Sequence, residues 1–296
     1  MSDFQEWSRT IAGEMERTLE SLLPPSASEP RRLHDAMRYA TLGGGKRVRP
    51  MLAHGAGLIS GAPAGRVRIV SSAVETIHAY SLAHDDLPCM DDDVLRRGKP
   101  TCHVEFDEAT ALLAGDALQA LAFELMSAHQ LADSPSQQLD MLKVFSRACG
   151  AHGMAGGQAI DLANVGRQIT LPELEFMHIL KTGALIRASV LLGAMCGQAL
   201  PPERIEKLDQ YGKCVGLAFQ VVDDILDCES NTEKLGKTAG KDQDANKPTY
   251  VSLMGLVPAK RFADELLADA LDALSTFDGK ADRLRQLAEF IVRRLY

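Results

Sequence analysis

Two clusters of aspartates are the groups in this sequence that could do chemistry. The first, DDLPCMDDD, covers residues 85–93, and the second, DDILD, covers residues 223–227; each follows an apolar stretch. Carboxylates at the carboxyl end of a helix oppose the helix dipole and repel one another, so they need a compensating cation. Mg²⁺ prefers oxygen ligands and usually takes one or two carboxylates together with substrate phosphates. The two clusters therefore predict a magnesium-dependent site for a phosphorylated substrate.

The first cluster should lie at the end of a helix. Pro88 is poorly tolerated inside a helix, so the helix should end or distort just before it. This places Asp85 and Asp86 on the last turn and lets the chain bring Asp91 back towards them. An EF-hand loop is excluded for both clusters, because neither has the required glycine at position six and glutamate at position twelve.

The second cluster should lie on one face of a helix. Asp223 and Asp227 are four residues apart, and Asp224 and Asp227 are three apart, so all three project from neighbouring turns. A single DDxxD is as often a solvated acidic patch as a metal site. Two of them, together with the basic segments described next, favour the metal site.

Two basic segments could hold a second anion without a metal. The segment GGGKRVRP covers residues 43–50, where glycines allow close approach to a ligand and Lys46, Arg47 and Arg49 supply positive charge. The segment RRGKPT, residues 96–101, directly follows the first aspartate cluster. Three further lysines flank the second aspartate cluster in sequence: Lys181, Lys237 and Lys247.

Helices must position these groups. Residues 68–87, 109–131, 174–192 and 202–227 carry apolar residues at three- and four-residue spacing, and alternating β-branched runs are absent. Gly212 and Gly216 lie inside the last of these segments, where they permit close helix packing. No composition shift or fixed repeat marks a boundary, so we expect one all-α domain over residues 1–296.

The bulk composition restricts partners and location. The chain of 296 residues has a net charge of −8, which argues against a nucleic-acid partner. It has no apolar run of about 18 residues that could span a bilayer, and its N-terminus lacks the pattern of a signal peptide. The six cysteines form no CxxC pair, which indicates reduced thiols in the cytoplasm.

Taken together, the motifs resemble those of the trans-isoprenyl diphosphate synthases, and most closely those of the bacterial farnesyl diphosphate synthases. The resemblance runs from about residue 33 to residue 250, with these motifs in order: GGGKRVRP, IHAYSLAHDDLPCMDDDVLRRGKPT, GMAGGQAIDL, LKTGALI, FQVVDDILD and LGKTAGKD. The resemblance implies the isoprenoid synthase fold, a helix bundle around a deep central cavity, and usually a homodimer. It also implies a prenyltransferase that joins isopentenyl diphosphate to dimethylallyl and geranyl diphosphate.

The resemblance further implies roles for individual residues. Three Mg²⁺ ions, which Mn²⁺ could replace, would bind the allylic diphosphate through Asp85, Asp86, Asp91, Asp223, Asp224 and Asp227. The same diphosphate would be held by Arg96, Lys181, Lys237 and Lys247, and the diphosphate of isopentenyl diphosphate by Lys46, Arg49, His78 and Arg97. Thr182 and Gln220 would lie along the forming cation and Phe219 near the isopentenyl group. Gln158 and Asp161 of the GGQxxDL motif would support these residues.

The product length should depend on Tyr80. It lies five residues before Asp85, about 7.5 Å along a helix, where a ring would form a floor for the growing chain. Ser81 is small and would not stop a shorter product. In the family this aromatic residue, together with the two-residue insertion Pro88-Cys89, goes with C15 products, so we expect (2E,6E)-farnesyl diphosphate.

Other interpretations remain open at this stage. A geranylgeranyl (C20) synthase uses the same chemistry, and a non-catalytic partner subunit would be expected to have lost one aspartate motif. A terpene cyclase or head-to-head synthase would have no use for GGGKRVRP.

Single residues also have alternative interpretations. His78 could be a packed core histidine, and His84 is expected to be structural. Gln158 and Asp161 could simply satisfy buried polar groups. Phe176, Met177 and Met195 are expected in the core rather than at the floor of the site.

Overall fold

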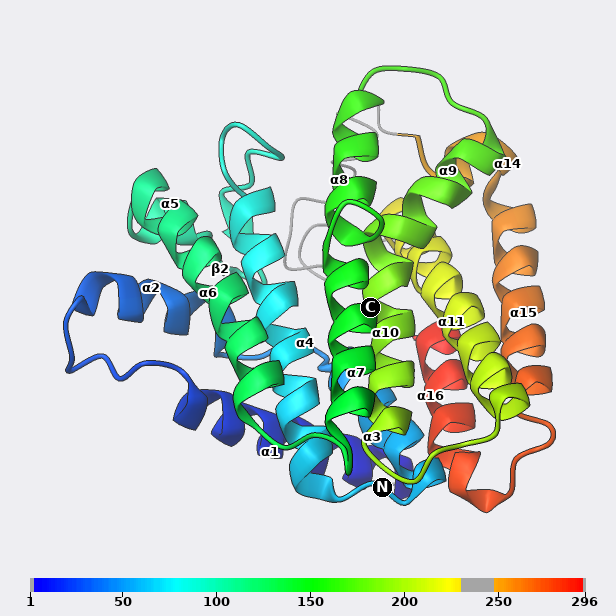
Figure 1. Cartoon of the computed structure of the whole chain (residues 1–296). Helices are drawn as coiled ribbons and strands as arrows, with labels where there is room; N and C mark the ends of the chain where they lie inside the picture. The colour runs from blue at the N-terminus through cyan, green and yellow to red at the C-terminus, as the bar shows by residue number, and fades with distance from the viewer. Residues whose placement is uncertain (1–2, 230–247, 295–296) are drawn as a thin grey trace.

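The computed structural model describes residues 3–229 and 248–294. In this part of the chain nearly all regular structure is helical (Figure 1), which confirms the all-α prediction. A pair of two-residue strands, β1 (Leu95–Arg96) and β2 (Lys99–Pro100), forms an antiparallel hairpin just after the first aspartate cluster.

The first half of the bundle supplies the first aspartate cluster. Its helices are α1 (Asp3–Leu22), α2 (Arg31–Thr41), α3 (Val48–Ser60), α4 (Ala64–Asp85), α5 (Cys102–Glu105), α6 (Glu108–Ala128) and α7 (Pro135–Cys149). Helix α4 is buried along most of its length because it packs against both α3 and α6. A long apolar helix of this kind is held by tertiary packing, and it projects its carboxyl end towards the site.

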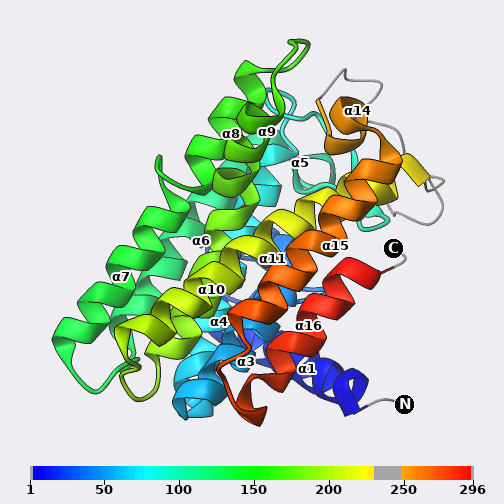
Figure 2. The same cartoon turned by 90° about the vertical axis from the view of Figure 1, so that its right-hand side faces the viewer.

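The second half supplies the second cluster. It comprises α8 (Met154–Ala163), α9 (Leu171–His178), a π-helical turn (Ile179–Gly183), α10 (Ala184–Met195), α11 (Pro202–Glu229), α14 (Tyr250–Met254), α15 (Leu256–Ala273), a 3₁₀ turn (Gly279–Ala281) and α16 (Asp282–Arg293). Helices α11, α15 and α16 lie side by side in Figure 2. Helices α4 and α11 both end in the upper half of the bundle as drawn in Figure 1.

Two glycines bring neighbouring helices onto the π-helical turn. A Cβ at Gly157 of α8 would lie 2.1 Å from the backbone nitrogen of Lys181, and one at Gly216 of α11 would lie 2.9 Å from the Cα of Gly183. Any side chain there would push the helices apart. The close packing predicted for α11 is therefore confirmed, and it determines where Lys181 and its neighbours lie.

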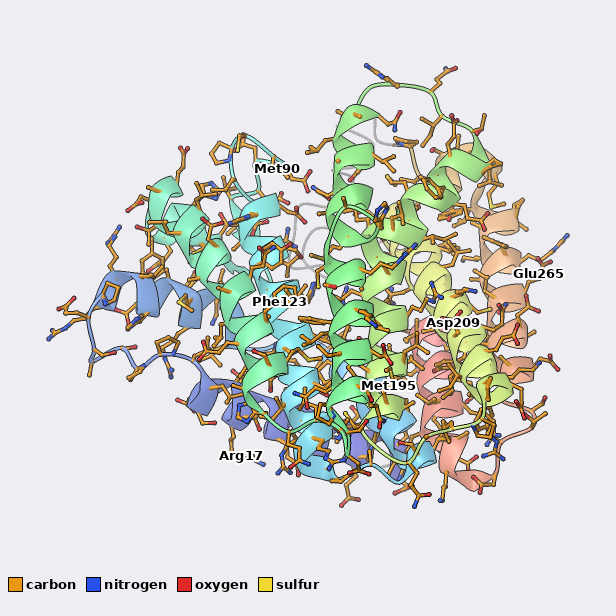
Figure 3. All side chains as sticks on the ribbon, in the orientation of Figure 1. Arg17, Met90, Phe123, Met195, Asp209 and Glu265 are labelled. Carbon is orange, nitrogen blue, oxygen red and sulfur yellow. The ribbon has the colours of Figure 1, made fainter. Side chains whose placement is uncertain are left out.

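The predicted core residues differ in their outcome. Met177 is buried and Met195 packs against a core cluster near the lower end of α10 (Figure 3). Phe176 is 55% exposed, so its assignment to the core was wrong; one step along the helix separates it from the buried face of Met177. The expectation that no stretch of the chain could span a bilayer does not hold by length and composition alone. Two segments, Glu108–Ala128 and Leu171–Met195, are long and apolar enough to cross a membrane, although core helices of globular proteins pass the same test.

Candidate active site

The first aspartate cluster forms the predicted turn at the end of α4. The helix ends at Asp85, and Asp86 is its C-cap. The backbone N–H of Asp91 donates to the carbonyl of Asp85 at 2.8 Å, and that of Asp93 donates to the carbonyl of Asp86 at 3.2 Å. Met90 lies in the loop above the helix (Figure 3). The chain after Pro88 thus returns to the helix end, as the sequence predicted.

Negative charge is concentrated at this helix end. Burial raises the pKa of Asp85 to about 6; the charge of Lys181 opposes this effect, and that of Asp91 adds to it. Asp86 is 2% exposed and is bound by Arg96, whose Nε lies 2.8 Å from Oδ1 and whose Nη2 lies 2.6 Å from the same oxygen. Arg96 therefore holds Asp86 in this structure, although both residues were expected to serve the allylic diphosphate.

The π-helical turn carries Lys181 and Thr182 between the two aspartate clusters. Lys181 Nζ donates to Asp161 Oδ2 at 2.5 Å, and Thr182 Oγ1 donates to Gln220 Oε1 at 3.1 Å. The sequence predicted an uninterrupted helix here. A π turn inserts an extra residue into the helix and is frequent at functional sites. It was missed because side-chain spacing alone does not reveal it.

The second cluster is tied to the same turn through Gln220. Gln220 Nε2 donates to Asp224 Oδ1 at 3.1 Å, and the backbone N–H of Tyr250 donates to Asp224 Oδ2 at 2.8 Å. Asp224 and Asp227 are buried, at 5% and 8% exposure. A continuous path of hydrogen bonds therefore links Thr182 to the DDILD cluster.

One cavity brings together residues from most of the predicted motifs. It has a volume of about 340 Å³, and its lining includes Arg49, His78, Tyr80, Ser81, Asp85, Gln158, Lys181 and Thr182. Lys46 instead lines a neighbouring cavity of about 420 Å³ with Arg293 and Arg294. Arg96, Arg97 and Asp86 line a third, narrower one. The residues expected to bind isopentenyl diphosphate are thus divided among adjoining spaces.

Charged residues that line these cavities affect one another's pKa values. Burial lowers the pKa of Lys46, as does the charge of Arg294, while Asp223 raises it. Burial also lowers the pKa of Arg49, which is affected by Arg97 and Asp223 as well. Lys46 and Arg49, from the first half of the chain, therefore share their electrostatic environment with the second aspartate cluster.

His78 is a neutral imidazole among arginines. Burial is the main cause that lowers its pKa well below the usual value, and the charges of Arg49 and Arg97 lower it further. It lines the central cavity. A neutral ring can still donate one hydrogen bond to an anion. His78 therefore reaches the cavity, as a substrate-binding residue must and a packed core histidine need not.

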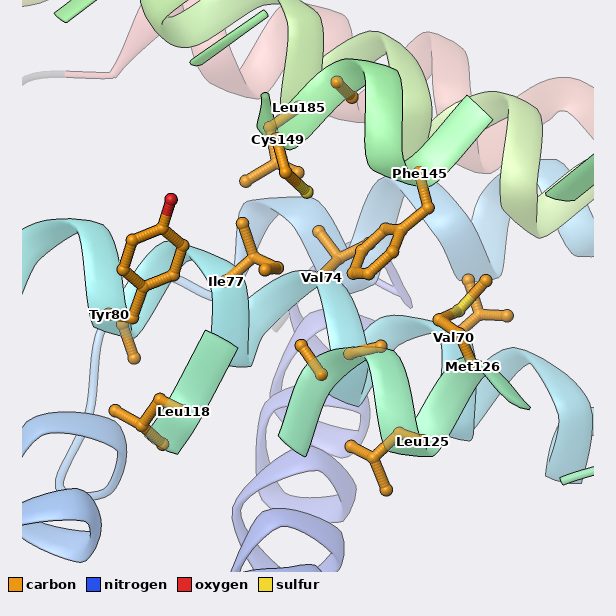
Figure 4. Packing of buried hydrophobic residues seen from close by; sticks show 14 of the residues in the cluster. Val70, Val74, Ile77, Tyr80, Leu118, Leu125, Met126, Phe145, Cys149 and Leu185 are labelled. Carbon is orange, nitrogen blue, oxygen red and sulfur yellow. The ribbon is translucent and has the colours of Figure 1, made fainter. Parts of the chain in front are cut away.

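Tyr80 stands at the end of a row of apolar side chains. It is 8% exposed, and Figure 4 shows it on α4 beyond Ile77 and Val74, with Leu118 of α6 nearby. His84 meets its ring edge to face, with 5.6 Å between ring centroids and an interplanar angle of 84°. Both residues line the central cavity. The ring is therefore held in a fixed orientation at the apolar side of the site.

The C-terminal end of the described chain adds Arg294, a residue that the sequence analysis did not assign to the site. Arg294 Nη2 donates to Asp223 Oδ1 at 2.7 Å and to the carbonyl of Phe219 at 2.9 Å. Its guanidinium lies 4.0 Å from the centroid of the Phe219 ring. The available signal in the sequence was the pair of adjacent arginines, Arg293 and Arg294. Lys237 and Lys247 lie outside the described residues.

The donor atoms suit magnesium. The two clusters offer carboxylate oxygens, and burial of Asp85 beside Asp91 leaves negative charge that a cation would offset. Within residues 3–229 and 248–294, no three His, Cys, Asp or Glu side chains are arranged to hold a metal by themselves. Mg²⁺ usually takes only one or two protein carboxylates and keeps substrate phosphates and water as its other ligands.

Comparison with known proteins identifies the family of this chain. The family described as "Polyprenyl synthetase" matches residues 30–286. The probable farnesyl diphosphate synthase of Bradyrhizobium diazoefficiens is 48% identical, covering 96% of this chain and 86% of its own. The farnesyl diphosphate synthase of Haemophilus influenzae is 46% identical, covering 99% of both chains. A chloroplastic geranylgeranyl pyrophosphate synthase from Arabidopsis thaliana is 45% identical, covering 99% of this chain and 84% of its own.

Solved structures show the same fold. An FPP/GFPP synthase from Zymomonas mobilis superposes with a TM-score of 0.87 at 40% identity, covering 98% of this chain and 99% of its own. A geranyltransferase from Helicobacter pylori, complexed with magnesium and isoprenyl diphosphate, has a TM-score of 0.85 at 32% identity, covering 99% of this chain and 97% of its own. From the match over most of its length and the identity to these relatives, the chain belongs to the polyprenyl synthetase family.

Proposed function

We propose that this protein is a prenyltransferase that condenses isopentenyl diphosphate with dimethylallyl and then geranyl diphosphate, releasing pyrophosphate and giving (2E,6E)-farnesyl diphosphate. The observation that carries the proposal is the central cavity. It is lined by Asp85 and Lys181 for one diphosphate, by Arg49 and His78 for the other, and by Tyr80 at its apolar side. Relatives named farnesyl diphosphate synthase support the product.

The first diphosphate would be held where the aspartate clusters approach the π-helical turn. Asp85, Asp91, Asp223, Asp224 and Asp227, with Asp86, would hold Mg²⁺, for which we propose three ions, with Mn²⁺ able to substitute. When bound, the metal would offset charge on the departing pyrophosphate. Lys181, fixed by Asp161, would donate to the same oxygens, and Arg96, Lys237 and Lys247 would add positive charge.

The second diphosphate would be held without metal by Lys46, Arg49, His78 and Arg97. As the carbon–oxygen bond of the allylic substrate breaks, its electron pair leaves with pyrophosphate. The double bond of isopentenyl diphosphate then attacks the allylic carbon, with Phe219 near the isopentenyl group. Thr182 and Gln220, which are hydrogen-bonded to each other, would lie along the forming cation. A proton finally passes to a pyrophosphate oxygen, so no side-chain nucleophile is required.

The wider context follows from the same family. We propose one domain over residues 1–296, acting as a homodimer in the cytoplasm. Exposed leucines on α6 support an oligomer contact, because Leu112 and Leu113 are 47% and 56% exposed. The six cysteines are all free, in keeping with a reducing compartment. The net charge of −8 argues against a nucleic-acid partner.

The direct test is incubation with labelled isopentenyl diphosphate and each allylic starter, with and without Mg²⁺. We expect a C15 alcohol after dephosphorylation and chromatography, and no product in EDTA. A C20 alcohol as the main product would instead support a geranylgeranyl diphosphate synthase. Absence of product with every starter, combined with a changed product from an added active synthase, would support a non-catalytic subunit.

A further inference from the structure

The first arginine of the GGGKRVRP segment, Arg47, does not line the central cavity. Arg47 is 4% exposed, and its Nη1 donates to Glu75 Oε1 at 2.7 Å. Its Nη2 donates to Glu16 Oε2 at 2.8 Å and to the carbonyl of Thr41 at 2.9 Å. The sequence grouped Arg47 with Lys46 and Arg49 as an anion-binding residue. The structure corrects this, because its guanidinium is occupied by two carboxylates from α1 and α4.

These ion pairs hold an unusual turn. Arg47 has a φ of 48°, in the left-handed region, and is the N-cap of α3. A non-glycine residue persists there when surrounding contacts determine it. Glu16 also accepts the backbone N–H of Gly43 at 2.6 Å, so one carboxylate binds both ends of the Gly43–Arg47 turn. This turn sets the direction in which Lys46 and Arg49 leave the backbone.

Glu75 also faces the second basic segment. Burial lowers the pKa values of Arg49 and Arg97, and the charge of Glu75 opposes that effect at both. Arg97 donates to the carbonyl of Gly44 at 2.8 Å, and its guanidinium packs so closely on Gly45 that a Cβ there would lie 2.9 Å from its Cζ. The two basic segments therefore interlock, with one buried carboxylate beneath them.

We propose that Glu75, acting through Arg47 together with Glu16, is the positioning residue of the metal-free diphosphate site. It fixes the turn that presents Lys46 and Arg49 to isopentenyl diphosphate and keeps Arg97 against that turn. The physical reason is preorganisation: gathering several cations before an anion arrives is opposed by their mutual repulsion, and a buried carboxylate offsets it. The proposal rests on the proposed function and deepens one half of it.

The test separates the two substrates. In Glu75→Gln and Glu75→Asp, we expect the KM for isopentenyl diphosphate to rise about tenfold, because the turn loses its anchor, while the KM for geranyl diphosphate changes less than about twofold. Glu75→Asp keeps the charge but shortens the reach, so it isolates geometry. If Glu75 only made the site less positive and did not position the turn, Glu75→Gln would lower the KM for isopentenyl diphosphate and Glu75→Asp would leave it unchanged. That result overturns the proposal.

Removing Glu75 leaves the buried Arg47 with Glu16 as its remaining carboxylate partner and could impair folding, so a second variant is needed. The Glu16 side chain is 37% exposed, so Glu16→Gln is better tolerated, and it should raise the same KM by a smaller factor. Glu20 lies on the same helix as Glu16, and its exposed carboxylate pairs with Arg38 of α2; Glu20→Gln is therefore the matched control and should change neither KM.

Binding of isopentenyl diphosphate alone, measured by calorimetry without Mg²⁺, gives a readout independent of turnover. We expect weaker binding to the Glu75 and Glu16 variants than to the parent. If the parent condenses both substrates but the variants bind isopentenyl diphosphate as tightly as it does, this inference fails and the proposed function stands. If the parent itself neither binds isopentenyl diphosphate nor forms product, the proposed function fails.

Discussion

Arg294 places its guanidinium against a carboxylate of the second aspartate cluster: Nη2 lies 2.7 Å from Oδ1 of Asp223. The same guanidinium stacks on Phe219, one turn earlier on α11. The Arg294 side chain is 3% exposed and that of Asp223 is 41% exposed, so the guanidinium is buried while the carboxylate remains reachable from solvent. A residue expected to bind a cation thus already carries a positive partner.

This pairing predicts how the enzyme responds to magnesium. In Arg294→Met, the Mg²⁺ concentration that gives half-maximal activity should fall about fivefold, because an ion pair of about 1 kcal/mol no longer competes for Asp223. The measurement is initial rate against Mg²⁺ at saturating substrates. Arg293→Met is the control, since Arg293 pairs with Asp264 on the surface. A higher magnesium requirement in Arg294→Met would show that Arg294 assists the metal rather than competing with it.

Tyr80 should set the product length. Tyr80→Ala removes the ring at the apolar side of the cavity, so C20 and longer products should appear, whereas Tyr80→Phe keeps the ring and should keep C15. The products are compared by chromatography after dephosphorylation. The floor assignment is wrong if C15 remains the sole product of Tyr80→Ala.

Asp161 should act through Lys181. Asp161→Asn removes the charge that fixes the Lys181 ammonium at 2.5 Å, so we expect kcat to fall about tenfold and the KM for geranyl diphosphate to rise. The KM for isopentenyl diphosphate should change little. Asp140→Asn, which breaks an exposed pair with Lys143 on α7, is the matched control. Equal losses for both substrates would indicate general damage to the site.

His54 should make the fold sensitive to acid. Burial, with a further contribution from Arg68, lowers the pKa of His54 to about 4, against about 6.5 in an unfolded chain. Below pH 6.5 the unfolded state therefore binds a proton that the folded state does not. The free energy of unfolding should fall as the pH drops from 6.5 to 4, by up to about 3 kcal/mol.

Denaturant unfolding at pH 7.5 and pH 5.0 measures this effect. The parent should lose about 2 kcal/mol between the two values through His54. His54→Gln, which cannot take up the proton, should lose that much less than the parent, and His152→Gln, at an exposed position, should behave like the parent. Equal losses in His54→Gln and the parent would contradict the assignment.

The sequence by itself determined the helical class and the chemistry of the ligands. Apolar spacing predicted α4, α6 and α11 within a few residues, because local periodicity decides which face of a helix is buried. Pro88 predicted the end of α4, since proline has no backbone N–H to donate to a hydrogen bond inside a helix. The two aspartate clusters limited the metal to one that prefers oxygen, whatever their mutual placement.

Only the tertiary structure decided which charges meet. Arg47 and Arg49 are two residues apart and of the same type, yet one is buried against Glu75 and the other lines the cavity. The reason is that Arg47 is itself in the left-handed conformation just before α3, whereas Arg49 lies in the first turn of that helix. The pairing of Arg294 with Asp223 joins positions 71 residues apart. Ion pairs of this kind depend on how helices pack, and no local spacing encodes that packing.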